Sequence, residues 1–139
     1  WLYRPVADPE TTLTAALERL AADVEDAHGV SVDVVTVGDC DLDEHLRALL
    51  HATREAVVNA AKYAGGTISL FAEVEPQQVT VFVRDRGGGF DLAAVPPDRL
   101  GVRQSILGRM ERNGGRAVLR SGAGEGTEVQ LEMPREVRA

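Results

Sequence analysis

Two alternating stretches joined by a short turn constrain the fold more than any other part of this sequence. Apolar side chains occupy every second position on both sides of residues 75–77 (Glu-Pro-Gln): Ile68, Leu70, Ala72, Val74, Val79, Val81 and Val83. A period of two buries one face of each strand, and the short connection favours antiparallel pairing. Residues 67–85 are therefore expected to form a β-hairpin.

Three segments carry apolar residues at helical spacing, about residues 9–28, 42–64 and 102–113. We expect Asp8 to be the N-cap of the first helix, with Pro9 at its first position and Gly29 as its stop. Asp41 and Glu44 have the spacing of a capping box at the start of the second helix.

Further strands are expected at residues 30–37, 117–121 and 127–133, with a long loop at 86–100 that is typical of a lid or binding loop. The order of elements is then α-β-α-β-β-loop-α-β-β. Strands that are mostly linked as hairpins, together with three helices, predict a two-layer α/β (α+β) sandwich with the helices on one face.

Length and charge narrow the class of protein. The chain has 139 residues, which fits one domain with one core, and its net charge of −7 argues against a nucleic-acid partner. No apolar run reaches the roughly 20 residues that span a bilayer, so direct membrane contact is not expected. No signal peptide is visible, and the first residue is not Met, which suggests an excised fragment. The single Cys40 excludes an internal disulfide and permits a reducing, cytoplasmic location.

The second predicted strand ends in a stretch suited to a flat ligand. Residues 85–90 read Asp-Arg-Gly-Gly-Gly-Phe. The Asp85 carboxylate can accept a hydrogen bond from an exocyclic amine, and Gly87 and Gly89 allow close backbone approach. The same residue types also form plain turns.

One face of the second helix carries polar groups at spacings of four and three: Glu55, Asn59 and Lys62. Asn59 offers a carbonyl oxygen to a hard cation such as Mg²⁺, Glu55 can act as a general base, and Lys62 can meet phosphate charge. The alternative is an ordinary solvated helix face, although the flanking Ala48, Ala52 and Val58 favour the wall of a cleft.

The third helix is expected to open at Gly101-Val102, and free amides at a helix start form an anion site. Arg103 and Ser105 can add a charge and a hydroxyl. Residues 124–127 (Gly-Glu-Gly-Thr) precede the last strand, so a glycine pair and the Thr127 hydroxyl can face the same phosphates.

In this order the motifs resemble the catalytic, ATP-binding domain of bacterial two-component sensor histidine kinases, within the GHKL superfamily of gyrase, heat-shock chaperone and mismatch-repair ATPases. Residues 55–64 are similar to the N box, 85–90 to the first glycine box, 100–115 to the second glycine box and 124–129 to the closing glycine–threonine motif. The resemblance covers nearly the whole chain and implies the Bergerat-type ATP-binding fold, with a mixed sheet.

The resemblance also implies roles for single residues. It assigns the adenine amino group to Asp85, Mg²⁺ to Asn59, the N-box acid to Glu55, and the phosphates to Gly101. Gly87 and Gly89 would line the base, and Thr127 would lie near the adenine through a water. The sequence departs from the family pattern at Tyr63, Arg99 and Ser105.

Phosphoryl transfer in such kinases needs an acceptor histidine on a dimerising helical hairpin, and His28, His45 and His51 do not lie in one. The acceptor is therefore expected upstream, with residues 1–8 as a lead-in from that region, 9–134 as the ATP-binding domain and 135–139 as a tail. The implied partners are the chain's own upstream dimerisation domain and a response regulator. The isolated chain should bind ATP without phosphorylating itself.

Two alternatives remain open on the sequence. An anti-sigma-factor serine kinase of the same superfamily fits the acidic surface and the small size. A nucleotide-binding module without turnover fits the presence of Arg99 where the family has glycine.

Overall fold

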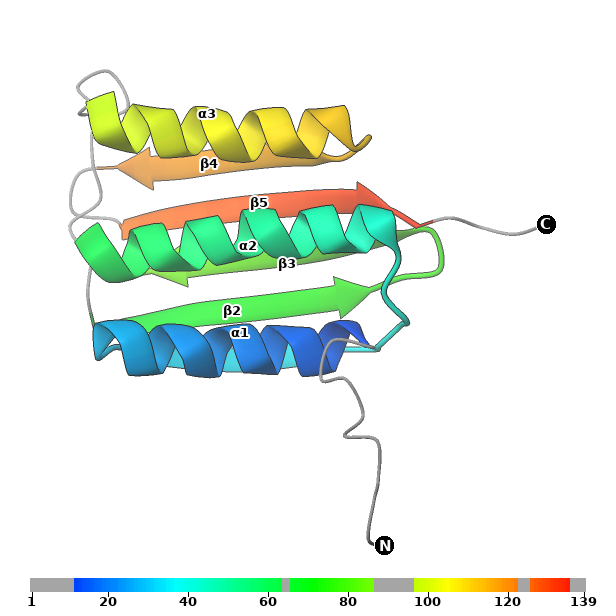
Figure 1. Cartoon of the computed structure of the whole chain (residues 1–139), viewed down its shortest axis with the longest axis horizontal. Coiled ribbons are helices and arrows are strands. Elements are labelled where there is room, and N and C mark those ends of the chain that lie inside the picture. Colours follow the sequence, from blue (N-terminus) through cyan, green and yellow to red (C-terminus); the bar gives the residue numbers. More distant parts are fainter. Residues whose placement is uncertain (1–11, 64–65, 87–96, 123–125, 136–139) are drawn as a thin grey trace, which may run out of the picture.

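The computed structural model describes residues 12–63, 66–86, 97–122 and 126–135. The elements follow the predicted order (Figure 1): α1 (Leu13–His28), β1 (Ser31–Val37), α2 (Glu44–Tyr63), β2 (Thr67–Val74), β3 (Gln78–Asp85), α3 (Pro97–Arg112), β4 (Arg116–Gly122) and β5 (Gly126–Pro134).

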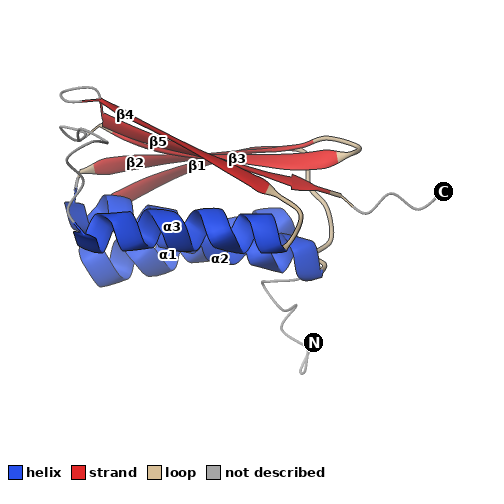
Figure 2. Ribbon diagram, turned by 90° about the horizontal axis from the view of Figure 1, so that it is seen from above, coloured by secondary structure: helices blue, strands red, loops and turns tan. Residues whose placement is uncertain are grey.

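The five strands form one mixed sheet in the order β1-β2-β3-β5-β4. Strands β1 and β2 are parallel, and the other three pairs are antiparallel, including the predicted β2–β3 hairpin. Figure 2 shows all three helices on one face of this twisted sheet. The two-layer α/β sandwich predicted from the sequence is confirmed.

The core lies between the two layers. Leucines of α1 and α2 and the inward residues of β2, β3 and β5 are almost fully buried: Leu13, Leu17, Leu46, Leu49, Ile68, Leu70, Val79, Val81 and Leu131. The apolar residues whose alternation predicted the hairpin thus face the helices. On the opposite sheet face, Phe71 and Phe82 form a tilted ring pair with centroids 6.0 Å apart.

The first helix begins at Leu13 rather than at Pro9, so the prediction of Asp8 as its N-cap is wrong. Thr12 is the N-cap, and its hydroxyl accepts from the Ala15 amide. The Leu13 amide donates to the Cys40 carbonyl, and the Thr14 amide donates to Asp39 Oδ1. A segment more than twenty residues away therefore supplies caps that local rules do not reveal.

The contact of Asp39 and Cys40 with the start of α1 shifts the pKa of Asp39, and burial shifts that of Cys40. Burial works to raise the pKa of Asp39, but hydrogen bonds from the Thr14 and Cys40 amides outweigh it and lower the pKa below its ordinary value. Burial raises the pKa of the Cys40 thiol. Cys40 is a free, half-buried cysteine.

The starts of the other helices also differ from the predictions. Asp43, not Asp41, caps α2, because its Oδ1 accepts from the Leu46 amide, while Asp41 forms an isolated β-bridge with Thr12. Helix α3 begins at Pro97, five residues before the predicted start. Proline suits the first helical position, since its missing amide would be unpaired there anyway.

Candidate functional site

Asp85 ends β3 on the face that packs against the helices. Its relative exposure is 5%, and the residue directly opposite on β5, Thr127, is 7% exposed. Aliphatic side chains fill the other inward positions of β3, so this strand end places a carboxylate beside a hydroxyl within an otherwise apolar layer. Such a buried polar pair is a candidate for ligand recognition.

Gly126 brings the β5 backbone against the end of β3. Its φ is +78°, and an added Cβ would collide with the Asp85 carbonyl oxygen. Only glycine therefore fits, for both conformational and steric reasons. The glycine–threonine motif thus packs directly on the strand end that carries Asp85.

The polar face of α2 lies next to α3. Glu55 and Asn59 are half-buried, whereas Lys62 in the last turn is exposed. Glu55 Oε1 accepts from Arg109 at 3.1 Å and from the Ser105 hydroxyl at 3.4 Å, both on α3. The predicted cleft wall is thus a contact between α2 and α3, with Glu55 held by a guanidinium and a hydroxyl.

Two buried polar atoms in this region lack a hydrogen-bond partner among the described residues: Asn59 Oδ1 and Arg109 Nε. Buried carbonyl oxygens are normally paired, so an orphaned one indicates that water or an ion completes it. Mg²⁺ usually keeps several water ligands and takes phosphate oxygens beside a small number of protein oxygens, so the Asn59 amide oxygen is a suitable ligand for it. Within the described ranges, no three His, Cys, Asp or Glu side chains gather closely enough to hold a metal ion by themselves.

The fold brings the separate motifs to one end of the molecule. The carboxyl ends of α2 and β3 and the amino ends of α3 and β5 all lie at the left end in Figure 1. Helix α2 also contacts α3, β3 and β5. The elements that carry Asn59, Asp85, Ser105 and Thr127 therefore lie next to one another.

For the remaining predicted site residues, the structure gives only a partial or a different position. Gly87 and Gly89 lie outside the described residues. Gly101, Val102 and Arg103 belong to α3, which starts at Pro97, so the prediction that Gly101 opens the helix is wrong. Arg109 was missed from the sequence, although its spacing of four from Ser105 places both residues on one helix face.

Among the helices of the described part, none has the length and apolar composition that crossing a bilayer requires.

Comparisons with known proteins identify the family of this chain. Residues 44–137 match the family described as histidine kinase-, DNA gyrase B- and HSP90-like ATPase. Comparison with curated protein sequences gives no match.

Solved structures show the same fold. The histidine kinase domain of the Erythrobacter litoralis EL346 blue-light activated histidine kinase has 23% identity and a TM-score of 0.68, over 85% of this chain and 62% of that one. The mycobacterial sensor histidine kinase MprB has 17% identity and a TM-score of 0.69, over 88% and 94%. Full-length ShkA in complex with AMPPNP has 20% identity and a TM-score of 0.64, over 89% of this chain and 30% of that one.

Proposed function

Since the chain belongs to the histidine kinase-, DNA gyrase B- and HSP90-like ATPase family, we propose that it binds Mg-ATP as the catalytic domain of a sensor histidine kinase. The γ-phosphoryl group goes to a histidine on an upstream dimerisation domain and then to a response regulator, in the cytoplasm. This chain spans 62% of the Erythrobacter domain, 94% of the MprB structure and 30% of ShkA, so the upstream domain and its histidine are part of the proposal.

The observation that carries this proposal is the buried Asp85 opposite Thr127. A carboxylate inside an apolar layer accepts a hydrogen bond from the adenine amino group and selects against bases that present a carbonyl there. The close approach of Gly126 fixes the backbone at the Asp85 end of the sheet. In the proposal, Gly87 and Gly89 line the same base.

The other polar groups serve the phosphates. Asn59 holds Mg²⁺, which neutralises phosphate charge when it is bound. Lys62, Gly101, Val102, Arg103 and Ser105 lie on the two helices that border the phosphates. Arg109 orients Glu55, whose carboxylate accepts a proton from the attacking group.

The positions of the three histidines support the proposal that the isolated chain binds ATP without phosphorylating itself. His45 Nδ1 donates to the Asn113 carbonyl at 2.9 Å, and His28 is the last residue of α1. His51 is exposed on α2, which packs between α1 and α3 in the same domain.

Calorimetric titration tests the adenine assignment. Asp85→Asn places an amide where the carboxylate accepts, so ATP affinity should fall by about tenfold to a hundredfold, because a hydrogen bond to a charged group contributes about 1.5–3 kcal/mol. The matched control is Asp33→Asn on the exposed part of β1, which should bind ATP like the wild type. Unchanged ATP affinity in Asp85→Asn would refute the adenine assignment.

The same titrations test the metal. Mg²⁺ should tighten ATP binding by the wild type, and Asn59→Ala should lose this effect while keeping metal-free affinity. A wild type that binds ATP equally well with and without Mg²⁺ would remove Asn59 as a ligand.

One observation favours a second candidate, a nucleotide-binding module without turnover. Glu55 is engaged by Arg109 and Ser105, which limits its use as a base. Under this alternative the full-length protein would bind Mg-ATP but form no acid-labile phosphohistidine.

A further inference from the structure

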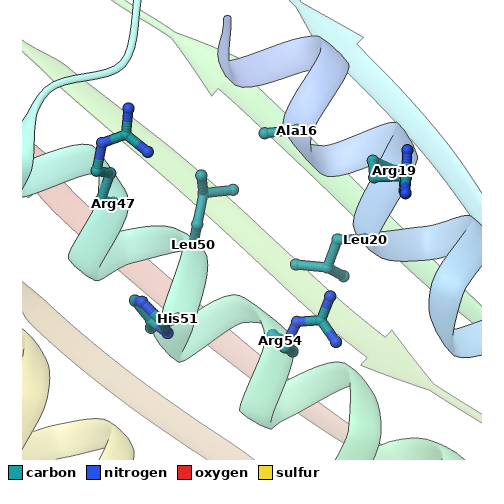
Figure 3. Close-up of a pocket in the computed structure, with 7 residues that line it drawn as sticks. All are labelled: Ala16, Arg19, Leu20, Arg47, Leu50, His51 and Arg54. Atoms are coloured by element: carbon teal, nitrogen blue, oxygen red, sulfur yellow. The ribbon is translucent and has the colours of Figure 1, made fainter. Parts of the chain in front are cut away.

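A groove between α1 and α2 lies apart from the proposed nucleotide site. Figure 3 shows Leu20 and Leu50 between the two helices, with Arg19 on α1 and Arg47, His51 and Arg54 on α2. Its cavity volume is about 170 Å³. Glu55 pairs with Arg109 of α3, whereas the groove lies between α2 and α1; among its lining residues, His51 is the one that lies a single helical turn from Glu55.

The groove carries excess positive charge. Asp23 pairs with both Arg19 and Arg54, at 3.4 and 3.3 Å, so one carboxylate compensates two guanidinium groups. The exposed side chains of Arg47 and His51 form no ion pair or hydrogen bond with other described residues. In a chain with a net charge of −7, this concentration of basic groups is a local reversal of sign.

The volume and the apolar lining of the cavity limit the kinds of ligand that it can bind. A cavity of this volume is smaller than the roughly 300–1,000 Å³ of small-molecule sites, yet it admits one aliphatic side chain. Leu20 and Leu50 supply an apolar floor that a bare phosphate would not need. A membrane surface or a nucleic acid would extend its negative charge over the acidic remainder of the protein, and repulsion would oppose binding.

We propose that this groove docks a short acidic segment of a partner protein. One aliphatic side chain of the segment packs between Leu20 and Leu50, and flanking carboxylates pair with Arg47 and Arg54. The apolar contact supplies burial, and the guanidinium pairs set the register and accelerate association. This proposal does not depend on the proposed kinase activity.

A random peptide library displayed on phage tests the proposal with the whole chain as bait. Enriched peptides should carry an aliphatic residue flanked by Asp or Glu. Their affinity should fall as salt rises, because rim charges are screened. A library without binders, or enriched peptides that lack acidic residues, would overturn the proposal.

Paired variants locate the site. Arg47→Glu with Arg54→Glu should weaken the selected peptides by at least about tenfold. Arg116→Glu with Arg120→Glu makes the same charge change on exposed β4 residues and should leave affinity within about twofold. Far-ultraviolet circular dichroism confirms that both double variants fold, and Leu50→Ala provides a second variant without charge change that should also weaken binding. Equal loss in both double variants would show long-range attraction only and would overturn the assignment to the groove.

Inorganic phosphate separates docking from simple anion binding. At equal ionic strength, phosphate and chloride should compete equally weakly with the peptide. Strong competition by phosphate alone would show a small-anion site and refute the docking surface.

Discussion

At the scale of single residues, the ion pair between Glu55 and Arg109 links the two helices of the candidate site. The groups are about two-thirds buried and 3.1 Å apart, so solvent screens them less than a surface pair. Removing one partner leaves the charge of the other partner without this compensation.

A double-mutant cycle measures this link. Glu55→Gln and Arg109→Gln should show a coupling free energy of about 1 kcal/mol in urea unfolding. The pair Arg120–Glu128, which is wider at 3.9 Å and has an exposed arginine, is the control and should couple by less than about 0.3 kcal/mol. Equal coupling in the two cycles would show that the α2–α3 contact does not depend on this pair.

Asp39 gives a prediction about pH. Its folded-state pKa is lowered, so its stabilising contribution is present above the ordinary aspartate pKa of about 4 and is lost as pH falls through the lowered folded value. Asp39→Ala should lower the free energy of unfolding by about 0.5–1 kcal/mol at pH 7. This is the lower part of the range for losing a helix N-cap, because the side chain is exposed to solvent.

Denaturant unfolding at several pH values checks this prediction. The difference between wild type and Asp39→Ala should shrink as the solution is acidified below pH 4. A difference that stays constant or grows in acid would contradict the assigned role of the carboxylate.

At the scale of elements, the contact between β3 and β5 depends on Gly126. Gly126→Ala adds a Cβ where the Asp85 carbonyl lies, at a φ that alanine adopts poorly, so it should destabilise the fold by about 2–3 kcal/mol. Because the β3 end must move, ATP affinity should fall as well.

Gly29→Ala is the matched control for that substitution. Gly29 also has positive φ, as the C-cap of α1, but nothing lies within 4 Å of an added Cβ. It should cost about 1 kcal/mol from backbone conformation alone and leave ATP affinity unchanged. Chemical denaturation and calorimetry distinguish the two variants, and equal effects would rule out the steric contact at Gly126.

At the scale of the whole molecule, one core joins the helical layer to the sheet. Leu17 of α1 is fully buried in it, whereas Val35 is 56% exposed on β1. Leu17→Ala should lower the free energy of unfolding by about 3 kcal/mol, and Val35→Ala by less than about 1 kcal/mol.

Cooperative urea unfolding, followed by fluorescence and circular dichroism, measures both changes. Coincident transitions are expected because a single core connects α1, α2 and the sheet. Separate transitions for helices and sheet would contradict a single folding unit.

The sequence was sufficient for the layer architecture and for the order of the motifs. Alternation around residues 75–77 and helical spacing in residues 42–64 are local patterns, and Gly29 ended the first helix as expected, with positive φ. These features depend on residues close together in the chain, so they can be deduced without knowing the tertiary contacts.

Other features depended on contacts between distant residues. The first amides of α1 are capped by Asp39 and Cys40, which lie more than twenty residues away in the chain. The partnership of Glu55 with Arg109 spans 54 positions. The sequence by itself determined which elements form and which polar groups they carry. Only the packing of α2 against α3 and the register of β3 with β5 decided which of those groups meet, because side chains far apart in the chain become neighbours only when the layers assemble.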